Sequence, residues 1–222
     1  MPLCIVVGAG PGIGLETARR FGREGFTVAL LARDGARCET LAAQLRSQGL
    51  QAHAFGADAG DPQALIAALA TVRRELGAAN VLVYNAWARH PVNVREVSPD
   101  LFLGDFRVNV LGALVAAQQV IPDMEAARAG TILFTGGGFA LNPSPDLVAL
   151  SVGKAALRSL TQALAKQMTP VGVHAATVTI CGLVKPDTPF SAQAVADAFW
   201  QLHRQPVGAF EDEIQIRSAP AP

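Results

Sequence analysis

Short apolar runs alternate along this chain with longer segments in which apolar residues recur at helical spacing. The apolar runs, which we expect to be β-strands, are residues 3–7, 26–32, 51–55, 80–84, 130–135, 173–180 and 213–217. The helical segments are residues 13–24, 35–48, a stretch that starts at 61–62, 98–124, 145–168 and 191–204. Most of the predicted strands are apolar throughout, which is typical of strands covered by helices on both faces. The alternation therefore predicts an α/β fold: a single Rossmann-like doubly wound domain, with a mainly parallel seven-stranded sheet and helices on both faces.

The size and charge of the chain narrow the class of protein. Its 222 residues suit one domain, which we place at residues 1–217, followed by a loose C-terminal tail at 218–222. The 18 basic and 18 acidic side chains give a formal net charge of zero, so we expect no nucleic-acid partner. No apolar run approaches the roughly 20 residues of a membrane span, and the N-terminus lacks the basic start of a secretory signal. We therefore expect a cytoplasmic protein with no membrane partner.

The cysteines give no sign of a metal or redox centre. The chain has three, at positions 4, 38 and 181, and no two of them stand at metal-ligand or redox spacing. We expect no metal site, and scattered free thiols suit a reducing compartment.

A glycine-rich turn follows the first predicted strand and opens the first predicted helix. Gly8, Gly12 and Gly14 give the spacing GxxxGxG, and Ile13 occupies the place of the last glycine in the commoner GxGxxG fingerprint. Glycines let the backbone approach a pyrophosphate closely, and the free N–H groups of a helix N-terminus attract that anion. In this position the turn predicts dinucleotide binding, although a glycine-rich turn can also serve only to pack a helix on a strand.

Further motifs follow in the order of a known family. Asp58 follows the third predicted strand, Asn85-Ala86 the fourth, and Asn109 and Lys154 lie in predicted helices 98–124 and 145–168. With the glycine turn, they resemble the short-chain dehydrogenase/reductase superfamily over essentially the whole chain. The resemblance implies that Asp58 contacts an adenine ring and that Asn85-Ala86 begins an NAG motif in which tryptophan replaces glycine. It also implies that Asn109 and Lys154 are the family's catalytic asparagine and lysine.

The resemblance implies a nicotinamide coenzyme, and the residues at the end of the second predicted strand help to distinguish NAD from NADP. The acid that selects NAD would stand at Ala32, and Arg33 comes next. A guanidinium pairs well with a 2′-phosphate, so we expect NADP(H), with NAD less favoured. In the alternative, Arg33 is a solvated surface charge and Asp34 caps the next helix. The expected coenzyme residues are Gly8, Gly12, Ile13, Gly14, Arg33, Asp58, Ala59, Asn85, Ala86, Lys154, Gly182 and Thr188.

Two catalytic side chains of the family are absent. The family's tyrosine, which gives a proton to the carbonyl oxygen, stands four residues before the lysine, or seven in one offshoot. Those positions are Leu150 and Leu147, and the only tyrosine of the chain lies in predicted strand 80–84. The family's serine falls on Gly137, and Thr135 would replace it only if the alignment shifted by two residues. The catalytic residues that remain are Asn109 and Lys154.

Four side chains could replace the tyrosine as proton donor. Lys154 lies one helical turn from Leu150, and the leucines beside it would lower its pKa by desolvation. Ser151, Cys181 and His90 are the other candidates. Their simpler interpretations are a small residue at a helix contact, a buried inert thiol and a surface-loop histidine.

The sequence leaves three functions open. The first is an NADP(H)-dependent short-chain oxidoreductase that acts on an unknown carbonyl or alcohol with an atypical proton donor. The second is a dinucleotide-binding protein without redox activity, such as a sensor, a scaffold or an inactive homologue, and the third is a non-redox enzyme on the same fold. The resemblance also implies a small-molecule substrate and a homodimer or homotetramer formed through the predicted helices 98–124 and 145–168.

Overall fold

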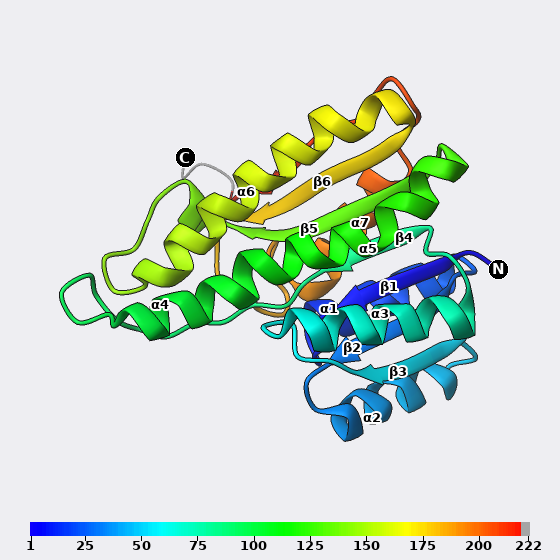
Figure 1. Ribbon diagram of the computed structural model, residues 1–222, viewed down its shortest axis with the longest axis horizontal. Coiled ribbons are helices and arrows are strands. Elements are labelled where there is room, and N and C mark those ends of the chain that lie inside the picture. The colour runs from blue at the N-terminus through cyan, green and yellow to red at the C-terminus, as the bar shows by residue number, and fades with distance from the viewer. Residues whose placement is uncertain (219–222) are drawn as a thin grey trace.

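The computed structural model describes residues 1–218, and within them seven parallel strands form one sheet in the order β3-β2-β1-β4-β5-β6-β7 (Figure 1). The strands are β1 (Leu3–Val7), β2 (Thr27–Ala32), β3 (Ala52–Gly56), β4 (Val81–Tyr84), β5 (Gly130–Gly137), β6 (Val173–Ile180) and β7 (Glu213–Ile216). The helices are α1 (Ile13–Arg23), α2 (Gly35–Arg46), α3 (Pro62–Leu76), α4 (Pro99–Phe106), α5 (Gly112–Ala127), α6 (Val148–Met168) and α7 (Ala192–His203). The predicted Rossmann-like fold is confirmed, with the strand order reversing between β1 and β4.

Helices cover both faces of the sheet, and each face has its own apolar core. α3, α5 and α6, which lie in front of the sheet in Figure 1, contribute to one buried cluster, and α1, α2 and α7 contribute to the other. In β1, Ile5 and Val7 belong to the first cluster, whereas Cys4 and Val6 belong to the second. Because successive side chains of a strand point to opposite faces, a strand buried on both sides has to be apolar throughout.

The long helix predicted at 98–124 is divided. α4 ends at Phe106, a π-helical turn spans Arg107–Leu111, and α5 continues from Gly112. The hydroxyl of Tyr84, at the end of β4, donates a hydrogen bond of 2.5 Å to the carbonyl oxygen of Val108 in this turn. A tertiary contact therefore supports the widened turn, and no helical periodicity in the sequence could have predicted it.

Of the element ends that differ from the prediction, two depend on contacts with other segments. β5 continues to Gly137 because Gly136 and Gly137 pair with β6, and a Cβ at Gly136 would lie 2.6 Å from the hydroxyl oxygen of Thr177. α6 begins at Val148 rather than near 145, since the hydroxyl of Ser151 accepts the N–H of Ser144 and holds the preceding loop against the first helical turn.

The predicted tail at 218–222 lies, beyond its first residue, outside the described part of the chain. Among residues 1–218, no helix is both long and apolar enough to cross a bilayer. In the same part of the chain, no group of three histidine, cysteine, aspartate or glutamate side chains is arranged to hold a metal ion.

Candidate active site

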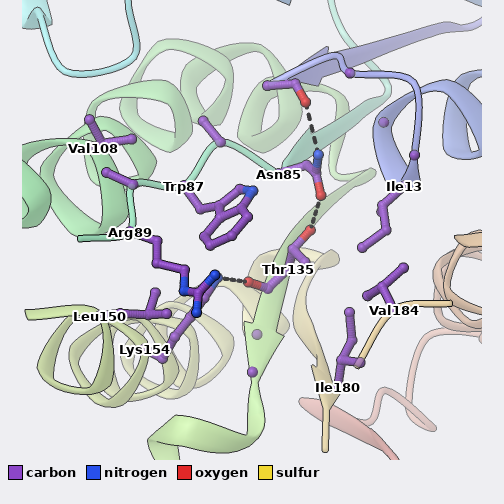
Figure 2. A pocket seen from close by; sticks show the side chains of 18 of the residues that line it. Ile13, Asn85, Trp87, Arg89, Val108, Thr135, Leu150, Lys154, Ile180 and Val184 are labelled. Carbon is purple, nitrogen blue, oxygen red and sulfur yellow. Dashed lines mark hydrogen bonds between the residues drawn. The ribbon is translucent and has the colours of Figure 1, made fainter. Parts of the chain in front are cut away.

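A large pocket opens at the carboxyl ends of the strands, where β1 and β4 meet (Figure 2). Its volume is about 1330 Å³, which exceeds the range of about 300–1,000 Å³ for most small-molecule sites. The glycine turn after β1 forms one wall, and the loops after β2, β4, β5 and β6 form the others. A pocket of this extent has room for an elongated ligand together with a second, smaller molecule.

The glycine turn is shaped by two glycines and left open by two others. Gly8 has φ +87°, and a Cβ there would lie 2.3 Å from the backbone nitrogen of Ala86. A Cβ at Gly14 would lie 2.9 Å from the Cα of Ala9, so α1 packs directly on the turn. At Gly10 and Gly12 a Cβ would meet no atom within 4 Å, and no side chain caps the start of α1. Leu15 and Glu16 donate their N–H groups to the Gly10 and Gly12 carbonyls, so the N–H groups of Ile13 and Gly14 are the ones left for an anion in this open cradle.

Arginines line the pocket where β2 ends. Arg33 lies at the rim, as expected from the sequence, and Arg37 lies one helical turn further on. Asp34 accepts the backbone N–H of Arg37 and caps α2, so its carboxylate serves the helix rather than a ribose. Arg37 was not among the residues expected from the sequence, although its spacing of four residues from Arg33 was a usable signal.

The remaining coenzyme residues expected from the sequence divide into two groups. Ile13, Asp58, Ala59, Ala86 and Gly182 line the pocket with the glycines and Arg33. Asp58 also accepts the backbone N–H of Gly60 at 2.8 Å, which holds the turn after β3. Thr188 does not line the pocket, because its hydroxyl bonds within its own turn, to the Lys185 carbonyl oxygen and the Phe190 N–H.

A chain of hydrogen bonds crosses the floor of the pocket (Figure 2). The amide of Asn85 donates to the Gly8 carbonyl at 2.8 Å and accepts the hydroxyl of Thr135 at 2.9 Å. The ammonium of Lys154 donates to the Thr135 carbonyl at 2.7 Å. The Thr135 hydroxyl is therefore occupied by its hydrogen bond to Asn85. Residue 137, the position that the resemblance assigns to the family's serine, is a glycine and carries no hydroxyl; a Cβ there would lie 3.5 Å from Lys154.

Lys154 is a buried cation beside two leucines. Its side chain is only 7% exposed, and desolvation by burial lowers its pKa from 10.5 to about 8. Leu147 and Leu150 are buried and line the same pocket, so the positions that the resemblance assigns to the family's tyrosine carry apolar side chains. The low pKa agrees with the desolvation expected from the sequence.

Asn109 lies in the π-helical turn, next to the start of α6. It is 1% exposed and does not line the pocket. Its amide oxygen accepts the N–H of Ala88 at 2.9 Å, and its amide nitrogen donates to the Ala88 carbonyl at 3.0 Å. A Cβ at Gly153 would lie 2.9 Å from the Cβ of Asn109, so the asparagine packs against α6 next to Lys154. It fixes the loop after β4 against α6, with both polar groups of its amide already paired.

The loop after β4 brings further polar side chains to the pocket. Trp87 and Arg89 lie near Thr135 of β5 in Figure 2, and His90 follows them in the lining. Nδ1 of His90 lies 2.7 Å from Oδ1 of Asp105 on α4. Sequence analysis treated His90 only as a candidate and did not identify Asp105, because 15 residues separate the two.

Two other parts of the lining come from the C-terminal segments. Arg217 follows β7 and lines the pocket, a position that the strand-end rule for such folds could have indicated. Cys181 follows β6 and also lines the pocket, and its sulfur lies 3.9 Å from the carbonyl oxygen of Thr179. Tyr84 is buried and lies outside the lining.

Comparison with known proteins agrees with this geometry. The short chain dehydrogenase family profile matches residues 3–198. The chain is 27% identical over 207 residues to 2,3-dihydro-2,3-dihydroxybenzoate dehydrogenase of Bacillus subtilis, covering 93% of this chain and 75% of that protein. It is 30% identical over 223 residues to 2-(S)-hydroxypropyl-CoM dehydrogenase 3 of Xanthobacter autotrophicus, covering 96% and 86%. The crystal structure of a short-chain dehydrogenase from Rhodopseudomonas palustris superimposes with a TM-score of 0.88 at 29% identity, covering 98% and 99%. The chain therefore belongs to the short-chain dehydrogenase family, a family of oxidoreductases on an NAD(P)-binding fold.

Proposed function

We propose that this protein is an NADPH-dependent oxidoreductase that reduces a small carbonyl compound, or oxidises the matching alcohol, with a site that lacks the family's tyrosine and serine. One observation carries the proposal. A single pocket joins an open glycine cradle and two arginines at one end to a buried lysine at the other. When bound there, the coenzyme supplies a hydride to the carbonyl carbon.

The polar groups of the pocket match the parts of such a coenzyme. The free N–H groups at the start of α1 suit a diphosphate, and no side chain fills the cradle at Gly10 or Gly12. Arg33 and Arg37 suit a 2′-phosphate, because guanidinium groups bind phosphate oxygens bidentately. Lys154, which lines the pocket beside the glycines at the end of β5, suits the hydroxyl groups of the nicotinamide ribose.

Titration with the two reduced coenzymes tests this assignment. We expect NADPH to bind at least about tenfold more tightly than NADH, measured by fluorescence and calorimetry, because loss of one charge-assisted bond costs about 1.5–3 kcal/mol. The double variant Arg33→Ala, Arg37→Ala removes that preference, whereas Arg74→Ala retains it, since Arg74 is exposed on α3 and does not line the pocket. Absence of binding heat with either coenzyme overturns the proposal.

The absent hydroxyl groups favour one second candidate, a coenzyme-binding protein without redox turnover. Leucines occupy both tyrosine positions and Gly137 the serine position. Loss of a positioned general acid costs about 10²- to 10⁴-fold in rate. This candidate predicts NADPH binding with no consumption in the presence of ketones or aldehydes. Under the first candidate, wild-type protein consumes NADPH with at least one member of such a panel.

We also propose that copies of the chain associate through α4, α5 and α6. Leu103 on α4 and Val152 on α6 are exposed apolar residues on these helices, 51% and 41% exposed. Light scattering on the purified protein is expected to give the mass of a dimer or tetramer, and a mass of 23.1 kDa at micromolar concentration contradicts this.

A further inference from the structure

His90 and Asp105 form a pair in which a buried carboxylate holds an imidazole at the pocket. His90 lines the pocket and its side chain is 57% exposed, whereas Asp105, on α4, is 1% exposed. Nδ1 of the imidazole lies 2.7 Å from one carboxylate oxygen. The other oxygen of Asp105 is buried and has no hydrogen-bond partner among the described residues. A carboxylate kept away from water in this way has the imidazole as its only partner in the described part of the chain.

The pairing bears on which ring nitrogen is free. With Asp105 ionised, the carboxylate only accepts hydrogen bonds, so the shared hydrogen lies on Nδ1. Nε2 is then the nitrogen left for another partner. Pro91 restricts the backbone of the residue before it, which helps to keep His90 in one orientation.

The loop that carries His90 is fastened on both sides. Two residues before it, both backbone groups of Ala88 bond to the amide of Asn109. Two residues after it, Val92 forms a bridge with Leu147, and its carbonyl oxygen accepts the N–H of Val148 at 3.4 Å. The loop therefore runs beside the start of α6, next to the positions where the family's tyrosine would stand.

The other candidate proton donors are less well placed. The Lys154 ammonium is buried and donates one hydrogen to the Thr135 carbonyl, and Ser151 does not line the pocket. Cys181 lines the pocket, and its thiol lies 3.9 Å from the Thr179 carbonyl oxygen. The Tyr84 hydroxyl is buried outside the pocket and bonded to the π-helical turn, and desolvation raises its pKa. Of these groups, the imidazole is the one that lines the pocket, is more than half exposed and is held by a buried carboxylate.

We propose, on the basis of the oxidoreductase function proposed above, that His90 is the proton donor of this site and that Asp105 is its positioning residue. The coenzyme's hydride adds to the carbonyl carbon, and the carbon–oxygen π electrons move to the oxygen. That oxygen takes the proton from Nε2 of the His90 imidazolium, leaving a neutral imidazole whose Nδ1–H stays on Asp105. Water then returns a proton to Nε2, for which the exposed half of the ring is suited. In alcohol oxidation the same proton moves in the opposite direction.

Replacement of His90 by asparagine separates this role from a purely structural one. The asparagine amide can donate to Asp105 as Nδ1 does, so the loop stays fastened, but it has no acid at the position of Nε2. With NADPH and a panel of ethyl pyruvate, diacetyl and 4-nitrobenzaldehyde, we expect kcat of His90→Asn to fall about 10²- to 10⁴-fold. The Kd for NADPH is expected to stay within twofold. Added imidazole is expected to restore part of the activity of His90→Gly.

Nitrogen NMR of the histidine rings gives a readout that needs no turnover. In the coenzyme-free protein, His90 is expected to show the hydrogen on Nδ1, and Asp105→Asn is expected to lose that signature and to lower kcat with little change in KM. With NADP⁺ bound, addition of the product alcohol is expected to shift the Nε2 signal of His90. The signal of His53, an exposed residue of β3 outside the pocket, is the control.

The outcomes distinguish this proposal from the function on which it rests. If wild-type protein binds NADPH but consumes it with no member of the panel, the oxidoreductase function fails, and the role of His90 fails with it. If wild-type protein turns over and His90→Asn keeps kcat within threefold, the function stands and His90 only fastens the loop. If the Nε2 NMR signal of His90 does not shift on addition of the product alcohol, the proposed role of His90 is also overturned.

Discussion

Replacing Lys154 with methionine tests how strongly the pocket desolvates its cation. Methionine keeps much of the length of the side chain and removes the charge. Burial lowers the pKa of Lys154 from 10.5 to about 8. That difference corresponds to about 3 kcal/mol by which the folded state disfavours the charged form.

The sign of the pH dependence follows from proton binding in the two states. Below about pH 8, Lys154 is protonated in both states, and the folded state bears the full cost of burying the charge. Between about pH 8 and 10.5, Lys154 is neutral in the folded state but still protonated in the unfolded state, so the free energy of unfolding rises with pH. Methionine does not titrate. The free energy of unfolding of wild type should therefore gain about 3 kcal/mol relative to Lys154→Met between pH 7 and pH 10.5.

Urea unfolding of both proteins at pH 7, 8, 9 and 10.5 measures this difference. The buried thiols of Cys4 and Cys38 and the phenol of Tyr84, whose pKa values burial raises, affect both proteins alike and cancel. Loss of the hydrogen bond to Thr135 changes the free energy of unfolding of the variant by an amount that varies little with pH. The test is therefore the pH dependence of the stability difference between the two proteins, not its absolute size. Two stability curves that stay parallel within about 0.5 kcal/mol would show that the ammonium is solvated, and the reasoning on Lys154 would be wrong.

Three further outcomes are expected. The affinity for NADPH, measured by fluorescence titration, falls as pH rises through about 8 in wild type, because the contact of Lys154 depends on its proton, and is flat over that range in Lys154→Met. Gly8→Ala lowers the free energy of unfolding by more than about 2 kcal/mol, because φ at Gly8 is +87° and a Cβ there would overlap the backbone. Gly10→Ala changes the free energy of unfolding by less than about 0.5 kcal/mol but weakens NADPH binding, because its Cβ enters the cradle. Equal effects of the two variants on stability would contradict this. Leu150→Tyr, four residues before the lysine, raises kcat for ketone reduction at least about tenfold in the His90→Asn background, and no gain there would show that a hydroxyl at this position does not reach the reacting oxygen.

The fold followed from features of the sequence that depend on local neighbours. Strands buried on both faces are mostly apolar, and β1 and β6 could be located to the residue because each is a largely apolar run. The glycine turn was identified from its spacing after a strand, and its open and closed positions agree with a cradle at the start of α1. The ends of α6 and β5 were misplaced, because side-chain contacts with other segments decided them.

The site followed only in part from the sequence. The resemblance gave Lys154 and Asn85 a place at the pocket, and both line it. It implied a catalytic role for Asn109 and a coenzyme contact for Thr188, and in the structure the side-chain polar groups of both are paired with backbone groups. A motif fixes which residue type stands at a position, but the hydrogen bonds available to that residue depend on segments that are distant in the chain.

By itself, the sequence determined the α/β class, the glycine turn after the first strand, and the leucines that stand four and seven residues before Lys154. These are properties of periodicity, spacing and residue type, which a single chain displays without folding. Only the tertiary structure decided that Arg37 and Arg217 join the pocket and that a buried aspartate on α4 holds the imidazole of His90. Each of these depends on the packing of a loop or helix against another segment, which sets burial and hydrogen-bond partners that no local pattern encodes.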